Sequence, residues 1–376
     1  MDIKKKVLLI ENSSSDFFKS RLQFANHLQK KGYEVFALVP HSESSNLSDS
    51  TIKIFNYHLN RNNNNFISSI KNILYFKKII KENNIDIIHS FRFQPNLLNV
   101  FANYFNKKIL ILHITGLGIA FSSRGWYYRI IQFLSQLIFQ IKLFRAYKVI
   151  VQNPDDKDDI LFCRLWKNKI EIIKGSGVDI NLFNSNSYNK LILRSKFNIL
   201  NNHVVFVCVT RLIWEKGISE MITAVKKINN HKIKLYIIGS PDIDNPRHVS
   251  QTFIDKFNSD PNISFLGRKD NIEELLSASD VFIYPSYYRE GIPRGILEAL
   301  SMSLPVITSN TPGCRLTVVE GKNGYLVRPK SEEDLIFAIK KILNNDLIKM
   351  GRYSRMLAEN EFQNEIIFKQ IEEIYK

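Results

Sequence analysis

Two glutamates, Glu290 and Glu298, are separated by seven residues in the segment YPSYYREGIPRGILE. The apolar run Val281–Tyr284 before them predicts a strand and the pattern Gly295–Met302 predicts a helix, so Glu290 lies on a loop. Glu298 falls near the end of the helix's second turn and looks back toward the loop, because Cα–Cβ bonds tilt toward a helix's N-terminus. We expect both carboxylates to face one ligand at the helix start, where free N–H groups favour phosphate. A polyhydroxylated ligand attached to a phosphate, such as a sugar nucleotide, suits this arrangement.

The turn between the two glutamates strengthens this prediction. Gly291 and Pro293 make a rigid turn that is expected to expose backbone amides beside Glu290. Taken singly, Glu290 is compatible with a helix cap and Glu298 with an exposed helical acid. It is the combined string that favours a binding site.

Two cations, Arg211 and Lys216, lie in the string VTRLIWEKG, directly after the apolar run Val204–Val209. Both are therefore expected on a loop at the carboxyl end of a strand. The Arg fork and the Lys point charge together can neutralise a diphosphate without a metal ion. The alternative is an ordinary solvated loop, because a chain with 52 Lys and Arg contains chance pairs. The glutamate string favours the binding-site interpretation.

Strand-like and helix-like segments alternate along the chain, which predicts parallel sheets with crossover helices. In the first half the expected strands are Val7–Ile10, Glu34–Val39, Ile85–His89, Ile109–Thr115, Val149–Gln152 and Ile170–Lys174. In the second half they are Val204–Val209, Leu235–Ile238, Ile263–Leu266, Val281–Tyr284 and Val306–Thr308. We therefore predict an α/β protein with two Rossmann-like, doubly wound domains that face a central cleft, with ligands at the carboxyl ends of the strands.

The Asn- and Ser-rich segment Asn184–Asn189 separates the two series of strands and is the predicted linker. The N-terminal domain then covers residues 1–185 and the C-terminal domain residues 186–355. Helical periodicity continues after Gly351. Residues 356–376 are expected to form a last helix that returns to the N-terminal domain.

The composition, 44% hydrophobic and 23% charged over 376 residues, is that of a folded protein of about two domains. The three cysteines are far apart in sequence, which argues against a disulfide framework or a zinc site and favours a reducing cytoplasm. The apolar run near the N-terminus is too short for a signal-peptide core. No apolar stretch is long enough to predict a membrane span.

The positive charge is concentrated in the first half. Residues 1–185 hold 26 Lys and Arg against 14 Asp and Glu, whereas the remainder holds 26 against 22. This asymmetry indicates an anionic partner such as lipid headgroups, nucleic acid or a phosphorylated acceptor. No nucleic-acid-binding signature accompanies it, so we favour an anionic membrane surface with a lipid diphosphate over a charge that serves only solubility.

The segment Trp126–Lys148 places apolar side chains on one helical face: Ile130, Leu134, Leu137, Ile138, Ile141 and Phe144. Basic side chains ring its ends: Arg124, Arg129, Arg145 and Lys148. One interpretation is a helix that rests in the bilayer interface. The other is a core helix that packs on the sheet. Phe17 and Arg21, after the first strand, are expected to line the same mouth of the cleft.

The tripeptide Asp156-Lys157-Asp158 matches D-x-D, a pattern that binds metal ions in some enzymes. Here Asn153 and Pro154 precede it, which predicts a helix N-cap with Pro in the first turn. We favour this structural interpretation, in which the acids complement the helix dipole.

Together these motifs resemble the family 4 glycosyltransferases, a large retaining group with the GT-B fold. The strings that carry the resemblance run in the family's order through nearly the whole chain: HITGLGIAF, VQNPDD, GSGVD, TRLIWEKG, FLGRKD, the glutamate string and TPGCRLTVVEGKNGYLV. The GLG and GSGVD strings favour the capsule and N-glycan branch, which includes undecaprenyl-diphosphate-linked N-acetylgalactosaminyltransferases.

The resemblance implies roles for the matching positions. Arg211 and Lys216 would bind the donor diphosphate and stabilise the departing nucleotide. Glu290 would lie beside the transferred sugar, and Glu298 would bind the ribose hydroxyls. Displacement would be front-side and metal-independent, through an oxocarbenium-like state, and no cofactor is expected.

Further donor contacts are implied by the same resemblance. The main chain at Leu266, Gly267 and Arg268 would meet the base. The amides of Gly291 and Ile292 would hold the sugar or phosphate.

One departure concerns the acceptor side of the site. Many family members place a His immediately before the GLG string that begins here at Gly116, and in this chain that position is Thr115. His113 lies two residues earlier, on the same side of a strand. Either His113 substitutes for the usual residue or the Thr115 hydroxyl suffices.

The expected activity is transfer of a sugar, such as an N-acetylhexosamine, from a UDP-sugar to a polyprenyl-diphosphate-linked saccharide. We expect this to occur at the cytoplasmic face of the inner membrane, with the protein peripherally bound and without nucleic acid as a partner. The alternatives are a sugar-nucleotide epimerase or phosphorylase on the same fold, and a non-catalytic basic protein that binds membranes or nucleic acid.

Overall fold

The computed structural model describes residues 4–41, 52–59, 66–106, 108–118, 121, 125–160 and 162–376. The chain forms two compact units. Unit 1 comprises Met1–Lys174 together with Ile367–Lys376, and unit 2 comprises Gly175–Ile366. Each unit is described by itself below.

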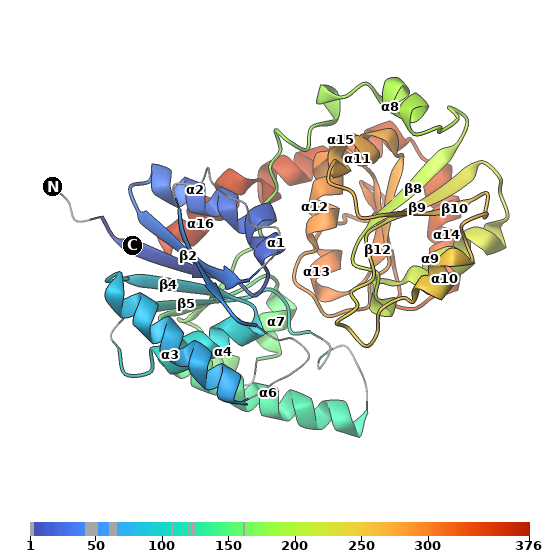
Figure 1. The fold of residues 1–376 in the computed structure, drawn as a ribbon. Helices are drawn as coiled ribbons and strands as arrows, with labels where there is room; N and C mark the ends of the chain where they lie inside the picture. Colours follow the sequence, from blue (N-terminus) through green and yellow to red (C-terminus); the bar gives the residue numbers. More distant parts are fainter. Residues whose placement is uncertain are drawn as a thin grey trace. The chain divides into compact units, whose positions relative to one another are not determined.

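Unit 1 is built on a seven-stranded parallel sheet with the order β3-β2-β1-β4-β5-β6-β7 (Figure 1). Its strands are nearly continuous apolar runs, as expected where both faces of a parallel sheet are covered. They are β1 (Lys6–Ile10), β2 (Glu34–Pro40), β3 (Lys53–Tyr57), β4 (Ile87–Phe91), β5 (Ile109–Ile114), β6 (Lys148–Val151) and β7 (Ile170–Ile172).

Helices cover both faces of this sheet (Figure 1). One face carries α2 (Leu22–Lys30) and the end of α16 (Asn364–Glu373), and the other carries α3 (Phe66–Glu82), α4 (Phe93–Ala102) and α6 (Trp126–Arg145). The remaining helical elements of this unit are α1 (Ser14–Asp16), a π-helical turn (Phe17–Arg21), α7 (Pro154–Asp158) and a 3-10 turn (Cys163–Trp166).

Unit 2 contains a six-stranded parallel sheet with the order β10-β9-β8-β11-β12-β13. The strands are β8 (Val204–Val209), β9 (Ile233–Ile238), β10 (Ile263–Gly267), β11 (Val281–Tyr284), β12 (Val306–Ser309) and β13 (Gly324–Val327). Its helices are α8 (Lys190–Lys196), α9 (Ile218–Ile228), α10 (Gln251–Asp255), α11 (Ile272–Ala278), α12 (Arg294–Ser301), α13 (Pro312–Arg315), α14 (Glu332–Leu343) and α15 (Leu347–Leu357). The predicted pair of doubly wound α/β domains is confirmed.

The boundary between the units differs from the prediction. The chain divides after Lys174, not after residue 185, because the segment that follows packs with the second core. The backbone of Val178 pairs with that of Gln363, and Phe183 is buried in the unit 2 core. Asn184 and Asn189 cap short helices of unit 2, so the Asn/Ser-rich segment is part of that unit and not a linker.

The C-terminal segment ends in unit 1. After α15 a π-helical turn (Ala358–Phe362) leads into α16, whose residues from Ile367 onward belong to unit 1. Tyr375 anchors this end, because its buried hydroxyl lies 2.6 Å from Nδ1 of His89 on β4. A contact of 3.1 Å between Nε2 of His27 and the Glu372 carboxylate joins the same helix to α2.

Two further sequence predictions are decided by local structure. Asn153 caps α7 by accepting a hydrogen bond from the Asp156 amide at 2.7 Å, with Pro154 in the first turn, so the N-cap prediction is confirmed. Within the described residues, no helix combines the length and the apolar character needed to cross a bilayer.

Candidate active site

The site predicted from the charged strings lies where the strand order of unit 2 reverses, between β8 and β11. In open α/β sheets the loops on either side of such a point diverge and leave room for a ligand at the carboxyl ends of the strands. Here the loop after β8 carries Arg211 and Lys216, and the loop after β11 carries Glu290.

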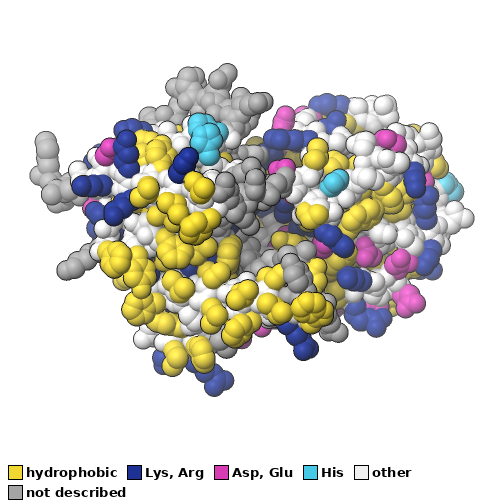
Figure 2. All heavy atoms as spheres, turned by 60° about the horizontal axis from the view of Figure 1, so that its bottom comes forward, with side chains coloured by type: hydrophobic (Ala, Val, Ile, Leu, Met, Phe, Trp, Pro, Cys, Tyr) yellow, Lys and Arg dark blue, Asp and Glu magenta, His cyan; other side chains and the backbone are white. Residues whose placement is uncertain are grey.

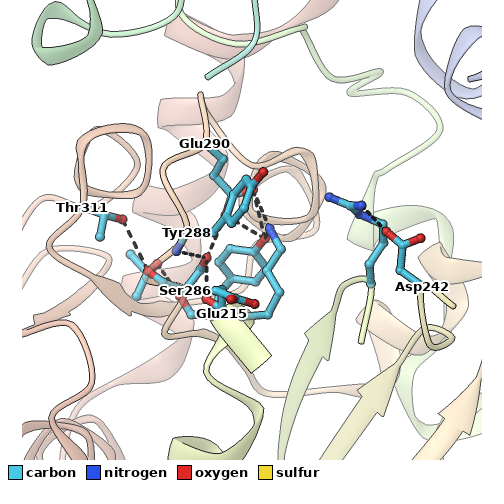
Figure 3. Close-up of polar contacts among 10 residues, drawn as sticks. Glu215, Asp242, Ser286, Tyr288, Glu290 and Thr311 are labelled. Atoms are coloured by element: carbon cyan, nitrogen blue, oxygen red, sulfur yellow. Dashed lines mark hydrogen bonds and ion pairs between the residues drawn. The ribbon is translucent and has the colours of Figure 1, made fainter. Parts of the chain in front are cut away.

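Lys216 and Glu290 are in direct contact, and Figure 3 shows Glu290 and Ser286 in the same group of polar contacts. The Lys216 ammonium lies 2.7 Å from Oε2 of Glu290 and donates to the Tyr284 hydroxyl, also at 2.7 Å. The Tyr284 hydroxyl donates to Oε1 of Glu290 at 3.0 Å, and Ser286 donates to the same oxygen at 2.9 Å. Both oxygens of the carboxylate are therefore held, and Lys216 is only 4% exposed.

Burial of this cluster shifts the pKa values of its tyrosine and of the neighbouring cysteines. Burial, reinforced by the negative charge of Glu290, raises the pKa of Tyr284 well above its ordinary value. The hydroxyl therefore stays protonated and remains a hydrogen-bond donor to the carboxylate. Burial also raises the pKa of the neighbouring thiols of Cys208 and Cys314 to about 12, which keeps them neutral.

A glycine allows the two loops to meet. Gly217 ends the 3-10 turn Trp214–Lys216 in the left-handed conformation, with φ of 75°. A Cβ at this position would lie 2.5 Å from the carbonyl oxygen of Pro285, which is closer than real contacts allow. The loop after β8 thus passes directly against the loop after β11, and this contact places Lys216 beside the end of β11.

Arg211 has a different partner. Its half-exposed side chain forms an ion pair with Asp242, which lies on the loop after β9. Figure 3 shows Asp242 to one side of the group around Glu290. The structure therefore joins two of the four predicted groups, Lys216 and Glu290, and places Arg211 on the same loop as Lys216 with an acidic partner of its own.

The loops after β8 and β9 are fastened to each other by two reciprocal charge pairs. Arg211 on the first loop meets Asp242 on the second, while Arg247 on the second donates to Glu215 on the first at 2.7 Å. Glu215 is buried. A Cβ at Gly239 would lie 1.7 Å from the Thr210 carbonyl oxygen, so the two backbones are in contact as well.

Glu298 lies on α12 and is largely buried. It accepts a hydrogen bond from Arg294 at 2.7 Å, one turn earlier on the same helix. The start of this helix packs against the end of β8, because a Cβ at Gly295 would lie 3.0 Å from the Val209 carbonyl oxygen. Glu298 thus belongs to the same edge of the sheet, and its contact with ribose stays a prediction.

The turn before α12 is more enclosed than predicted. Gly291 and Ile292 are both buried, and the Gly291 carbonyl lies so close to Gly313 that a Cβ there would be 1.7 Å away. The Ile292 side chain packs at Gly175 within the unit 2 core. The roles of these two amides in holding sugar or phosphate stay predictions.

The predicted base-binding segment ends β10. The ladder is irregular between Phe265 and Gly267, and Gly267 has a φ of +67°. Its carbonyl accepts a hydrogen bond from the Gly239 amide at 2.9 Å, which ties it to the loop after β9. Leu266 is half-buried whereas Gly267 and Arg268 are exposed, and their contact with a base stays a prediction.

Three of the predicted acceptor residues lie in the core of unit 1. Phe17 is fully buried and packs in the core between the sheet and α2, so the prediction that it lines an open mouth is wrong. Arg21 is also buried, since its guanidinium lies over the Phe91 ring and bonds Glu11 at 3.3 Å. The π-helical turn that contains both residues directs them inward.

His113 is fully buried at the end of β5. Its ring stacks on that of His89 and contacts the Phe91 ring at a tilt, and its Nε2 lies 3.3 Å from Gln152. The structure thus makes it a core residue and not a surface contact. Thr115 and Gly116 follow β5 and are half-buried, so an acceptor contact stays a prediction for them. Ile119 and Ala120 of the HITGLGIAF string, and Arg124, lie outside the described residues.

Sequence reasoning missed three residues of the site. The sequence pattern places Tyr284 in a strand and Ser286 in the glutamate string without indicating a role for either, whereas in the structure both hold Glu290. A polar side chain on the last residue of a central strand was the available signal for Tyr284. Asp242 carried no signal, because its pairing with Arg211 depends on the adjacency of two loops that are distant in sequence.

Within the part of the chain that the structure describes, no group of three or more His, Cys, Asp or Glu side chains is arranged to hold a metal ion.

Two family models match the chain. The one described as "Glycosyltransferase Family 4" matches residues 21–182, and the one described as "Glycosyl transferases group 1" matches residues 189–362. One similar curated protein is the N,N'-diacetylbacillosaminyl-diphospho-undecaprenol alpha-1,3-N-acetylgalactosaminyltransferase of Campylobacter jejuni. It is 25% identical over 364 residues, which are 96% of this chain and 93% of that protein.

A second relative is the UDP-Gal:alpha-D-GlcNAc-diphosphoundecaprenol alpha-1,3-galactosyltransferase of Escherichia coli. It is 26% identical over 323 residues, covering 83% of this chain and 80% of that protein. Among solved structures, Alr3699/HepE of Anabaena in complex with UDP superimposes with a TM-score of 0.79. The identity is 18%, and the match covers 98% of this chain and 99% of that one, which shows a shared fold.

The two parallel sheets, with charged groups at the reversal of the second one, define a glycosyltransferase with the GT-B fold. The chain belongs to the family 4 glycosyltransferases, a retaining group, as the sequence motifs predicted.

Proposed function

We propose that this enzyme transfers an N-acetylhexosamine, such as GalNAc, from a UDP-sugar to a polyprenyl-diphosphate-linked saccharide during assembly of a bacterial capsule, O-antigen or N-glycan. The names of the Campylobacter and Escherichia relatives, which cover most of the chain, support this donor and acceptor class. The reaction retains the anomeric configuration and proceeds without a metal ion. It takes place at the cytoplasmic face of the inner membrane, where the enzyme associates with the anionic surface.

The contact between Lys216 and Glu290 at the reversal of the unit 2 sheet carries this proposal. A buried ammonium at the carboxyl ends of strands is a fixed positive charge, and it needs no reorganisation when a nucleoside diphosphate departs. Arg211, on the same loop, supplies a second cation with a planar fork suited to phosphate. These two cations stabilise the negative charge of the leaving nucleoside diphosphate, as a bound metal ion does in other enzymes whose leaving group is a phosphate.

Glu290 has the complementary task. Tyr284 and Ser286 fix the orientation of its carboxylate, and Lys216 neutralises it. A carboxylate held in this way accepts hydrogen bonds from sugar hydroxyls and stabilises positive charge that develops on the ring. We assign it to the sugar that is transferred, with Glu298 on the ribose.

The test is turnover with a panel of UDP-sugars and polyprenyl-diphosphate-linked acceptors, followed by linkage analysis of the product. Lys216→Ala and Arg211→Ala are each expected to lower kcat by about two to three powers of ten, as for the loss of a donor to a developing anion. Lys226→Ala, an exposed lysine on α9, is the matched control and should leave turnover unchanged.

Two results would contradict the proposal. Turnover of folded Lys216→Ala within a few-fold of the wild type would remove this residue from the mechanism. Loss of activity in EDTA that manganese restores would contradict the metal-independent reaction. Incubation with the UDP-sugar alone separates a transferase from an epimerase, because only an epimerase rearranges the donor without acceptor.

A further inference from the structure

The burial of side chains on α6 distinguishes the two interpretations of its apolar stripe, a helix in the bilayer interface and a core helix. The side that packs on the sheet consists of Gln136, Phe139, Lys142 and Leu143, all of them buried. The ammonium of Lys142 donates to the Phe93 carbonyl at 3.2 Å and lies over the Phe93 ring, which fixes this side against α4. Of the predicted stripe, Ile138 is half-buried, but the other five side chains are exposed, so the core-helix interpretation is wrong for those five: Ile130, Leu134, Leu137, Ile141 and Phe144.

This exposed stripe is part of a larger surface. The helix α4 packs between α3 and α6 on the same face of the unit 1 sheet (Figure 1). Of the 28 large hydrophobic side chains that are exposed among the described residues, 13 lie on these three helices. Figure 2 shows hydrophobic side chains gathered over this part of unit 1. We call this surface, made of the exposed side chains of α3, α4 and α6, the apolar face.

The most exposed members of the apolar face are large. On α3 they include Phe66, which is 75% exposed, and Leu74, which is 61% exposed; on α6 they include Trp126 at 76% and Phe144 at 66%. A contiguous surface of this kind is costly in water and marks an interaction site in a folded protein. Phe and Trp on helix surfaces suit the boundary between headgroups and acyl chains.

The charged residues on the same helices indicate what kind of partner this surface binds. Apart from the buried Lys142, the three helices contain six Lys and Arg and one Asp or Glu, which is Glu82. Neither α4 nor α6 contains an acid, and exposed lysines of α3, namely Lys71, Lys77, Lys78 and Lys81, border the apolar side chains. A protein partner of mixed charge gains little from such a surface, whereas anionic headgroups above an apolar layer match both of its features.

We propose that the apolar face of unit 1 docks on an anionic lipid bilayer, with α6 and the start of α3 inserted at the level of the headgroups. The lysines of α3 contact the lipid phosphates. This assignment rests on the proposed lipid-linked acceptor for its role in the reaction, and it specifies which surface of the enzyme meets the membrane. It adds α3 and α4 to the helix that the sequence singles out.

The test is flotation of the full-length protein with phosphatidylcholine vesicles prepared with and without phosphatidylglycerol. Binding is expected to require phosphatidylglycerol and to weaken as salt is raised, because salt screens the lysines. The double variant Phe133→Ser/Phe144→Ser is expected to bind about a hundredfold more weakly, since two exposed aromatic side chains lose their contact with lipid. The matched control Phe337→Ser/Ile348→Ser changes two equally exposed side chains of unit 2 and should bind like the wild type.

The charge is tested in the same assay. Lys77→Gln/Lys78→Gln/Lys81→Gln is expected to lower binding by about a hundredfold, from roughly fivefold for each lysine near an anionic surface. The control Lys322→Gln/Lys340→Gln/Lys349→Gln removes three exposed lysines of unit 2 and should have no effect. Thermal unfolding shows that each variant is folded. Equal binding by test and control variants would overturn the proposal.

Two further outcomes separate this proposal from others. If the wild type ignores vesicles but forms a dimer that Phe133→Ser/Phe144→Ser dissociates, the face is a protein interface and the proposal is wrong. Turnover is measured on a short-chain, water-soluble acceptor and on a full-length acceptor in vesicles. The apolar-face variants should lose activity only on the vesicles. Absence of wild-type turnover on either acceptor would contradict the proposed function, whereas flotation tests the docking surface independently.

Discussion

The two units place charged groups at the same topological point but bury opposite charges. In unit 1 the strand order reverses between β1 and β4, and there the fully buried Glu11 is held by Arg21 at 3.3 Å and Arg92 at 3.1 Å. In unit 2 the reversal between β8 and β11 holds the buried cation Lys216, with Glu290 as its partner. In both units the charged pair lies where the strand order reverses, but the most buried member is the acid Glu11 in unit 1 and the base Lys216 in unit 2.

The difference lies in what surrounds each pair. Glu290 also accepts hydrogen bonds from Tyr284 and Ser286, so these two donors would still hold its carboxylate in place if Lys216 bound a ligand. Glu11 is surrounded by arginines, one of which is buried beneath the Phe91 ring. Burial lowers the pKa of Arg21, and the charge of Glu11 opposes this effect. The pair in unit 1 thus lies within the core, whereas the pair in unit 2 lies at the candidate active site.

The largest expected effect on stability follows from this contrast. Glu11→Gln removes the negative charge but keeps the shape, and leaves Arg21 buried without its counter-charge. We expect a loss of about 3 kcal/mol in the free energy of unfolding, typical of a broken buried pair. Urea titration, with hydrogen exchange of β1 and β4 as the local readout, measures it. The control Glu34→Gln breaks an exposed pair with Lys6 and should cost less than about 1 kcal/mol; equal costs would show that the Glu11 cluster is not structural.

A pH dependence of intermediate size is expected for unit 1. Burial, and secondarily the charge of Arg21, holds the pKa of His89 and that of His113 well below the ordinary value of 6.5. The folded state therefore binds fewer protons than the unfolded state, and stability is complete above about pH 6.5 and falls as the pH drops below it. The slope is up to about 1.4 kcal/mol per pH unit for each histidine.

Hydrogen exchange of β4 and β5 between pH 7 and pH 5 tests this prediction, with β8 and β11 as the reference in unit 2. The Nε2 of His89 and the Nδ1 of His113 have no hydrogen-bond partner among the described residues, so no acceptor compensates for a proton there. Protection in β4 and β5 that is independent of pH would show that the histidines do not resist protonation in the fold.

The smallest effect concerns the ion pair between the loops after β8 and β9. If Arg211 binds the donor diphosphate as proposed, the diphosphate has to compete with Asp242 for its half-exposed side chain. Asp242→Asn removes the competitor, and UDP is expected to bind up to about fivefold more tightly, the range of an exposed ion pair. Calorimetric titration measures the change, with Asp255→Asn on α10 as the control. Weaker binding by Asp242→Asn would mean that Asp242 orients Arg211 and does not compete for it.

The fold followed from the sequence where apolar runs are continuous. Both β8 and β11 begin and end at the predicted residues, because central strands of a parallel sheet contain little but apolar side chains. The edge strands β3 and β13 escaped prediction, since both are short and β3 is mostly half-buried. The division after Lys174 could not be predicted, because it depends on the pairing of Val178 with Gln363.

The candidate site followed from the sequence in part. Charged residues after strands predicted that Lys216 and Glu290 lie together, since strand ends in such sheets are where ligands bind, and the structure confirms their contact. The same reasoning failed for Arg21, because a charged residue was assumed to be exposed, whereas Glu11 compensates its burial. Partners such as Asp242 depend on which loops are neighbours, and a single sequence does not specify this.

The proposed joint role of Lys216 and Glu290 is tested by a double-mutant cycle on kcat with Lys216→Ala, Glu290→Gln and the combined variant. The two side chains are in contact, and if both act on a single transition state their effects should be strongly non-additive. The combined variant is then expected to be about as slow as the slower of the two single variants. A combined loss equal to the product of the two single losses would show that Lys216 and Glu290 act independently, and would contradict the central claim.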